Sequence, residues 1–205
     1  MHFRLIKALL GLLLLIFSLS MLTPIPFALY YQEATVPAFL TAFGITAAIG
    51  AVLWLPDRRP AGQMLVRDGF LITSLFWIVL GAFGSLPFIL SNALSLSAVD
   101  AVFESISGLT TTGATVITGL DSLPKSILYY RQQLQWLGGI GIIVIAIAIL
   151  PMLGVGGMQL YKADTPGPMK DNKLTPRVTG TAKVLFTIYL VMTIACGICY
   201  WLAGM

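Results

Sequence analysis

The stretch Ser105-Ile-Ser-Gly-Leu-Thr-Thr-Thr-Gly-Ala-Thr-Val116 lies between two long apolar runs and decides how the chain folds. Residues 97–109, which lead into it, have the mixed polarity of a helix roughly 20 Å long at 1.5 Å per residue. Such a helix is too short to cross a hydrocarbon core of about 30 Å. A half-crossing helix followed by Thr-Thr-Thr-Gly is typical of a re-entrant ion filter, in which backbone carbonyls replace the water around a dehydrated cation.

The composition indicates an all-α polytopic membrane protein. Of the 205 residues, 58% are hydrophobic and only 10% are charged, and the mean hydropathy is +0.92. Soluble domains average about 25% charged residues. The net charge of +4 does not indicate nucleic-acid binding, because the basic residues lie between apolar runs and not in a stripe interleaved with aromatic residues.

The spans are predicted from apolar runs of about the 20 residues that a membrane helix needs. Five such runs are present: 5–22, 36–55, 69–90, 134–153 and 182–202. Arg4 and Lys7 before the first run resemble the start of a signal peptide, but we expect this run to be retained as a helix.

The basic residues predict the orientation of these spans, because cytoplasmic loops carry the excess of Lys and Arg. Only Lys125 and Arg131 lie in gaps on one side, whereas the other ten of the twelve lie on the opposite side. These ten are Arg4, Lys7, Arg58, Arg59, Arg67, Lys162, Lys170, Lys173, Arg177 and Lys183. We therefore expect a cytoplasmic amino terminus, an outer loop at 23–35, and a segment 97–116 that enters and leaves through the outer face.

Few residues are available for catalysis. The one histidine, His2, lies at the amino terminus, and Cys196 and Cys199 lie in an apolar run, where helix packing is a better explanation than redox chemistry. An intramembrane enzyme would need a Ser/His, paired Asp or metal-binding set inside the bilayer, and the apolar runs contain none. We therefore expect no enzymatic activity.

Two acidic residues in the short helix, Asp100 and Glu104, have two possible roles. Near the helix start, a carboxylate is stabilised by the helix dipole by about 0.3–1 kcal/mol. At the outer mouth of a pathway, the same groups would concentrate cations. In either case, the negative end of the helix dipole points toward Gly108 and the loop that follows.

The loop itself supplies carbonyls and short hydroxyls from Thr110, Thr111 and Thr112. Gly113 has no Cβ, so the backbone there can turn a carbonyl inward in a conformation that strains other residues. Non-helical backbone at this depth is tolerated only where protein or a water-filled path satisfies it. The alternative is a Thr-rich membrane loop without a role in transport.

Glycines mark both ends of the fourth run. Gly138, Gly139 and Gly141 are most simply explained by close helix packing. At the inner end, Pro151 and the glycines that follow it are predicted to end or bend the helix, with a gating hinge as the alternative.

These features together resemble the Trk-type potassium uptake membrane subunit, whose superfamily includes the Ktr and plant HKT transporters. The resemblance covers essentially the whole chain, and it rests on four motifs taken in order. They are Gly108-Leu-Thr-Thr-Thr-Gly-Ala-Thr115, Gln135-Trp-Leu-Gly-Gly-Ile-Gly-Ile-Ile-Val144, Leu150-Pro-Met-Leu-Gly-Val-Gly-Gly-Met-Gln-Leu160 and Thr165-Pro-Gly-Pro168.

The resemblance implies two leading helices in residues 1–60 and a first pore unit in residues 69–158. Within this unit it implies the elements span 69–90, pore helix 97–109, filter 110–115 and span 132–153. Residues 159–181 would be a cytoplasmic linker, and residues 182–203 would be the first span of a second unit. Four such units surround one pore in this family, so this chain would supply one quarter of the filter.

The same resemblance implies that potassium is bound by the backbone carbonyls of Thr111, Thr112 and Gly113, with Ala114 and Thr115 at the outer end of the filter. It further implies a homodimer in the bacterial cytoplasmic membrane and a cytosolic, nucleotide-binding regulatory ring protein (TrkA-like) as partner. The expected function is potassium uptake, and the alternative is a non-conducting membrane scaffold or assembly fragment.

Overall fold

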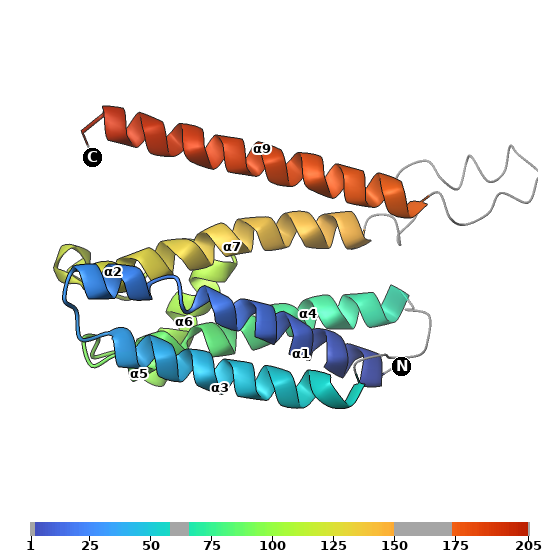
Figure 1. Ribbon diagram of the computed structural model, residues 1–205, viewed down its shortest axis with the longest axis horizontal. Coiled ribbons are helices and arrows are strands. Elements are labelled where there is room, and N and C mark those ends of the chain that lie inside the picture. Colours follow the sequence, from blue (N-terminus) through green and yellow to red (C-terminus); the bar gives the residue numbers. More distant parts are fainter. Residues whose placement is uncertain (1–2, 58–65, 150–173, 205) are drawn as a thin grey trace, which may run out of the picture. The chain divides into compact units, whose positions relative to one another are not determined.

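The computed structural model describes the backbone of residues 3–57, 66–149 and 174–204, and the side chains of residues 3–56, 71–141 and 183–204. Every regular element in these ranges is a helix (Figure 1). The chain divides into two units, residues 1–139 and 140–205, and each is described by itself.

Within the described residues, four helical stretches are long and apolar enough to cross a membrane: Phe3–Tyr30, Val36–Trp54, Leu71–Leu90 and Lys183–Leu202. They correspond to four of the five apolar runs in the sequence. The remaining run lies in α7 (Lys125–Ile149) up to Ile149, and its last residues are outside the described part of the chain, as are Pro151 and the glycines after it.

The first two long helices, α1 (Phe3–Ser20) and α3 (Val36–Trp54), pack against each other. Two glycines make this close approach possible. A Cβ on Gly11 would lie 2.7 Å from the backbone nitrogen of Trp54, and a Cβ on Gly50 would lie 3.0 Å from the carbonyl oxygen of Gly11. Small residues at a crossing are typical of helix packing in membranes, where burial of apolar surface adds little.

Two predicted elements are interrupted by short helices. The third run forms α4 (Val66–Gly84), breaks at Ser85 and continues as α5 (Leu86–Leu90), while the predicted outer loop contains α2 (Ile25–Tyr30). Each short helix has a proline in its first turn, where the missing N–H is not needed for an intrahelical bond. The sequence expectation of a plain loop at 23–35 was therefore wrong for α2.

The core of the first unit forms around Tyr130 on α7, which is completely buried. Its ring packs edge-on against Phe39 and Phe88, with centroids 5.6 Å and 5.3 Å away, and its hydroxyl donates to the carbonyl of Gly84 at 3.0 Å. The residue therefore ties α3, α5 and the end of α4 to α7. A buried tyrosine needs such an acceptor for its hydroxyl.

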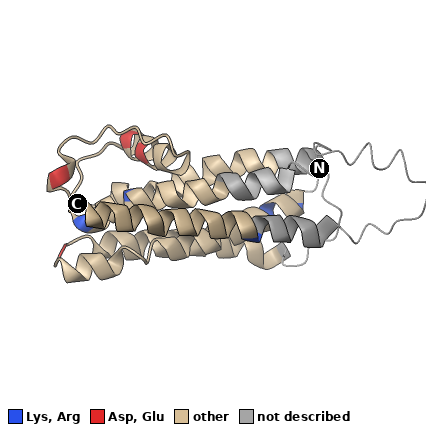
Figure 2. Ribbon diagram, turned by 90° about the horizontal axis from the view of Figure 1, so that it is seen from above, with Lys and Arg blue, Asp and Glu red and all other residues tan. Residues whose placement is uncertain are grey.

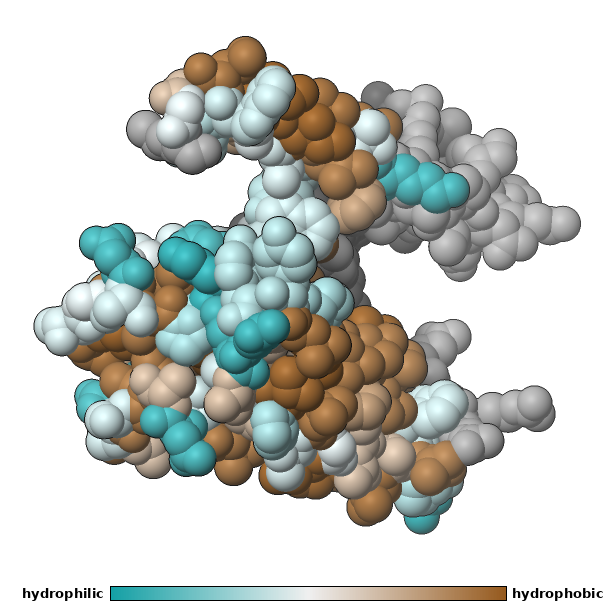
Figure 3. Space-filling model, turned by 60° about the vertical axis from the view of Figure 1, so that its left-hand side comes forward, coloured by the Kyte–Doolittle hydropathy of each residue, from teal (hydrophilic) through white to brown (hydrophobic). Residues whose placement is uncertain are grey.

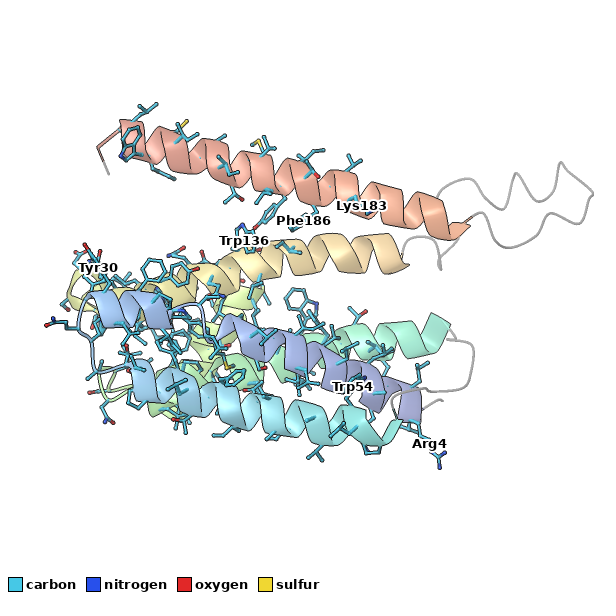
Figure 4. All side chains as sticks on the ribbon, viewed as in Figure 1. Arg4, Tyr30, Trp54, Trp136, Lys183 and Phe186 are labelled. Carbon is cyan, nitrogen blue, oxygen red and sulfur yellow. The ribbon has the colours of Figure 1, made fainter. Side chains whose placement is uncertain are left out.

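The two ends of the first unit differ. Arg4 and Trp54 lie at one end and Tyr30 lies at the other (Figure 4). The end with Tyr30, which we call the loop end, contains α2, α5 and the start of α7 (Figure 1). The Asp and Glu residues coloured red in Figure 2 lie toward this end. Polar residues cover this end, whereas hydrophobic residues cover the sides of the helices (Figure 3).

The helix α7 begins at Lys125, two turns before the span predicted at 132–153. The reason lies in a distant residue. The carboxylate of Glu33 accepts hydrogen bonds from the backbone N–H groups of Lys125 and Ser126, and from the Ser126 hydroxyl. These N–H groups have no partner inside the helix, so a polar stretch that hydropathy excludes from the span is still stable as helix.

The second unit contains the end of α7 and α9 (Leu174–Leu202). This helix begins ahead of the apolar run predicted at 182–202, so part of the predicted linker 159–181 is helical. Cys196 and Cys199 are unpaired and exposed on it.

Candidate functional site

The short helix α6 (Ala98–Leu109) begins at a conventional cap. The hydroxyl of Ser97 accepts from the backbone N–H of Asp100 at 3.2 Å and donates to the Asp100 carboxylate at 2.7 Å. Side-chain oxygens at this position satisfy N–H groups that the helix leaves unpaired. Asp100 therefore has the structural role at the helix start that the sequence suggested.

The far end of α6 lies deep along α7. A Cβ on Gly138 would lie only 1.9 Å from the carbonyl oxygen of Leu109, so the end of α6 touches the α7 backbone there. From Lys125 to Gly138, α7 rises about 20 Å. The chain then returns through η2 (Leu120–Ser122) to the start of α7, so this segment enters and leaves at the loop end (Figure 1).

Thr111 ends α6 in an unusual way. The N–H of Thr111 donates to the Gly108 carbonyl at 2.9 Å, and the N–H of Thr112 donates to the Ser107 carbonyl at 3.0 Å. This pair of bonds is the Schellman motif, which requires a left-handed residue after the helix and usually takes glycine. Thr111 has a φ of 58°, a strained conformation for a β-branched residue. Strain of this kind is typical of functional sites.

The same hydrogen bonds set the directions of the carbonyls that follow. The N–H groups of Thr112 and Gly113 both donate to the carbonyl of Ser107, at 3.0 Å and 3.3 Å. In a trans peptide the preceding C=O points away from the N–H. The carbonyls of Thr111 and Thr112 therefore point away from α6, and no hydrogen bond within the described residues ends on them or on the carbonyl of Gly113.

Gly113 has a φ of 73°, which residues with a Cβ rarely adopt. A Cβ at this position would meet only the Gln135 amide nitrogen, at an ordinary 3.6 Å. Glycine is thus required here by the backbone conformation and not by a lack of space. Together with Thr111, it makes alternate residues of this short loop left-handed.

Beyond Gly113 the backbone turns back to the protein. The carbonyl of Ala114 accepts a hydrogen bond from the Ser107 hydroxyl at 2.7 Å, so it faces α6. The hydroxyl of Thr115 donates to the carboxylate of Glu104 at 2.5 Å. Among the filter residues 110–115 that the resemblance implies, Ala114 and Thr115 are therefore held by α6, whereas the carbonyls of Thr111, Thr112 and Gly113 accept no hydrogen bond within the described residues.

Glu104 does not have either of the roles that the sequence suggested. It is 3% exposed, accepts hydrogen bonds from the loop and pairs with Arg131 at 3.0 Å. It is therefore neither a dipole-stabilising group at the helix start nor a solvated group at an outer mouth. The sequence does not indicate that Glu104 binds residues 115–117, because these residues come beside α6 only when the loop turns back.

Sequence reasoning also missed Ser107, whose carbonyl and hydroxyl together hold residues 112–114. The available signal was the i, i+3 spacing of Glu104 and Ser107, which places two polar groups on one face of a helix beside apolar spans. Within the described residues, no three His, Cys, Asp or Glu side chains form a metal-binding group. The oxygen atoms that this loop offers are its backbone carbonyls and its threonine hydroxyls.

Comparison with known proteins identifies the family. The sequence profile of TrkH, described as a cation transport protein, matches residues 35–205. The chain belongs to the TrkH family. It is 59% identical over 205 residues to the Trk system potassium uptake protein TrkH of Halomonas elongata and 56% identical to that of Escherichia coli, covering 100% of this chain and 42% of each relative. It is also 45% identical to the Escherichia coli protein TrkG over 204 residues.

Among solved structures, the crystal structure of the potassium transporter TrkH from Vibrio parahaemolyticus matches with a TM-score of 0.85 at 52% identity. The match covers all of this chain and 40% of that one. The chain thus spans about two fifths of the length of its TrkH relatives. The resemblance seen in the sequence is confirmed, and the chain is a multi-span membrane protein of a transport family and not of an enzyme family.

Proposed function

We propose that this chain supplies one of four filter segments of a potassium uptake pathway. The observation that carries the proposal is that the Ser107 carbonyl accepts two backbone hydrogen bonds from the loop. It holds the N–H groups of Thr112 and Gly113 and so directs the carbonyls of Thr111 and Thr112 away from α6. Oxygen dipoles held in this way replace the hydration shell of a cation, as a selectivity filter requires.

Potassium in this proposal is the transported substrate and not a resident cofactor. Its ligands in this chain are the carbonyls of Thr111, Thr112 and Gly113. One segment offers oxygens from one side, whereas a dehydrated cation needs a ring of them. The exposure of residues 110–116 in the described chain is consistent with three further segments facing them.

The proposed pore unit comprises residues 69–158, in which α4 and α5 are the first span, α6 is the pore helix, residues 110–115 are the filter and α7 is the second span. Residues 1–60 supply two leading helices, residues 159–181 contain a cytoplasmic linker, and residues 182–203 belong to the next unit. The short length of α6, the contact of its end with Gly138 of α7 and the family match support this division.

The protein lies in the cytoplasmic membrane with the loop end outside. The asymmetry of basic residues supports this orientation. Tyr30 and Trp54 at opposite ends of the first unit support a membrane-spanning position, because aromatic residues are enriched at both membrane interfaces. Single cysteines in a cysteine-free complete subunit test it. A cysteine at Gln32 should react with an impermeant reagent in intact cells, whereas one at Arg59 should not, and the reverse pattern would refute the orientation.

Family resemblance extends the proposal to a homodimer and to a cytosolic nucleotide-binding ring protein that docks on the inner face. The inner loops carry the basic residues that an acidic protein surface would contact. Cross-linking of the complete subunit in membranes tests the dimer, and co-purification of the ring protein tests the second partner.

The decisive experiment is rubidium uptake by the complete subunit that contains this chain, in cells without their own potassium uptake systems. We expect saturable uptake, which potassium inhibits and Gly113→Ala reduces. The alternative, a non-conducting scaffold, predicts no uptake above that of empty cells and no effect of Gly113→Ala.

A further inference from the structure

Glu104 is a buried charged residue to which the proposed function assigns no role. Its side chain is 1% exposed, and its Oε2 atom lies 3.0 Å from Nε of Arg131, whose side chain is 10% exposed. A charge buried to this degree is costly unless it is paired and hydrogen-bonded. Ionisable residues among membrane helices usually have a function.

The two oxygens of the Glu104 carboxylate have separate partners. Oε2 accepts from Arg131, whereas Oε1 accepts from the Thr115 hydroxyl at 2.5 Å and the Val116 N–H at 2.7 Å. The N–H of Ile117 lies 3.3 Å from the same oxygen. An ionised carboxylate only accepts hydrogen bonds, so it can serve donors on both sides at once.

Glu104 and Ser107 lie one turn apart on the same face of α6 and hold consecutive parts of the loop. Ser107 binds residues 112–114, and Glu104 binds residues 115–117. The residues with unbonded carbonyls are thus attached to α6 at both ends. If the second attachment is lost, only the bonds to Ser107 remain, and the backbone after Ala114 loses its attachment to α6.

We propose that Glu104, oriented by Arg131, is a positioning residue that holds residues 115–117 and thereby keeps the carbonyls of residues 111–113 aimed at the transported cation. This inference rests on the proposed function. It assigns a role in ion affinity and selectivity to a side chain that does not itself touch the ion.

Two neutral double variants of the complete subunit test the proposal. Glu104→Gln with Arg131→Gln keeps an oxygen facing the loop, because the amide introduced at position 131 puts its oxygen where the Arg131 Nε atom stood. That oxygen accepts from the amide N–H introduced at position 104, whose own oxygen is left for the loop. Glu104→Leu with Arg131→Leu removes the same charges but leaves no acceptor for the loop. Replacing both members of a buried pair with apolar residues is often tolerated by the fold. Asp100→Asn, on the same helix, is the control for a loss of charge.

We expect the Leu pair to raise the KM for rubidium about ten-fold and to lose discrimination against sodium, whereas the Gln pair and Asp100→Asn stay within about two-fold of the parent. Ten-fold corresponds to about 1.4 kcal/mol, the scale of a buried hydrogen bond left unmade. A merely structural role would lower the amount of protein in the membrane and the maximal rate, with KM and sodium discrimination unchanged. Equal KM and discrimination in the two pairs would overturn the proposal.

If the Leu pair fails to accumulate, the single variant Glu104→Gln takes its place. The N–H group of the new amide must then face a donor, either Arg131 on one side or the loop on the other. The KM of this single variant should rise, and it should return to the parental value when Arg131→Gln is added. Equal KM values for the single variant and the Gln pair would again overturn the proposal. A spin label at position 118 should become more mobile in the Leu pair and not in the Gln pair. Absence of uptake by the parent refutes the proposed function itself, which is a different result from parental uptake that Glu104 variants do not change.

Discussion

Two glutamates hold two parts of the loop end in contrasting ways. Glu33, which is half-buried, accepts the first backbone N–H groups of α7. Glu104 is buried, accepts from residues 115–117 and pairs with Arg131. Both side chains accept hydrogen bonds from backbone N–H groups in another part of the chain. Glu33 caps the start of a regular helix, whereas Glu104 supports backbone with no regular structure.

The contrast shows where a carboxylate is replaceable. At a helix start near the surface, water can satisfy the N–H groups that a side chain leaves. Irregular backbone between membrane helices is tolerated only where protein groups or a water-filled path satisfy it, and the N–H groups of residues 116 and 117 are bonded to the buried Glu104 side chain. We therefore expect Glu33 to affect stability, and the segment around Glu104 and Gly113 to affect transport.

The largest effect should come from Gly113→Asp, which tests the irregular segment directly. We expect uptake to be abolished, because a fixed carboxylate beside the carbonyls binds the cation and does not release it. Gly113→Asn is the matched control, since Asn and Asp tolerate positive φ about equally and only Asp is charged. Growth of a potassium-uptake-deficient strain at low potassium measures both, with expression in the membrane checked. Full growth with Gly113→Asp would refute the filter assignment.

Gly138→Ala should come next, and it tests how closely the irregular segment lies against α7. The added Cβ would lie 1.9 Å from the Leu109 carbonyl oxygen, so α6 must move. We expect lower thermal stability of the purified subunit by about 1–3 kcal/mol, together with weaker uptake. Gly44→Ala is the control, because nothing lies within 4 Å of its Cβ and alanine favours the helix. Equal melting temperatures for the two variants would contradict this packing.

Glu33→Ala should have a smaller effect, and it sharpens the comparison from the other side. Loss of the cap on α7 should cost about 1 kcal/mol of stability, measured as a lower melting temperature. The KM for rubidium and the discrimination against sodium should stay at parental values. If this variant changed sodium discrimination as much as the Glu104 variants do, the distinction between the two glutamates would be wrong.

Thr110→Ser should have the smallest effect. The Thr110 hydroxyl donates to the Ile106 carbonyl at 2.8 Å and lies 2.8 Å from the Thr112 hydroxyl. Serine keeps this hydroxyl, so rubidium uptake should remain within about two-fold of the parent, a difference below about 0.5 kcal/mol. A loss comparable with that of Gly113→Ala would mean that the Thr110 methyl group, and not the backbone, shapes the site.

Much of the fold was accessible from local patterns. Apolar length located four spans, and the mixed polarity of residues 97–109 located α6, whose start the Ser97 cap places at Ala98. The errors came from residues whose partners are distant in sequence. The early start of α7 depends on Glu33, and the short helix α2 depends on prolines that hydropathy assigns to a loop.

The candidate site divides in the same way. Gly113 stood out from the sequence because only glycine adopts positive φ without strain, and its φ of 73° agrees with that expectation. The left-handed conformation of Thr111 did not stand out, because threonine is a poor choice there. The role of Glu104 was misassigned because its position in α6 suggested a residue near the helix start.

The sequence by itself determined that this chain is a membrane protein of the TrkH family with a half-length helix and a glycine-ended threonine loop. The family rests on its sequence motifs, and the other properties follow from apolar length, from charge distribution and from residue types at fixed spacing, all of which are local. Tertiary structure alone decided which carbonyls of the loop are unbonded and which side chains hold them. Direction depends on hydrogen bonds that Ser107 and Glu104 accept from residues that reach α6 only after the chain has turned back, and no local pattern encodes that return.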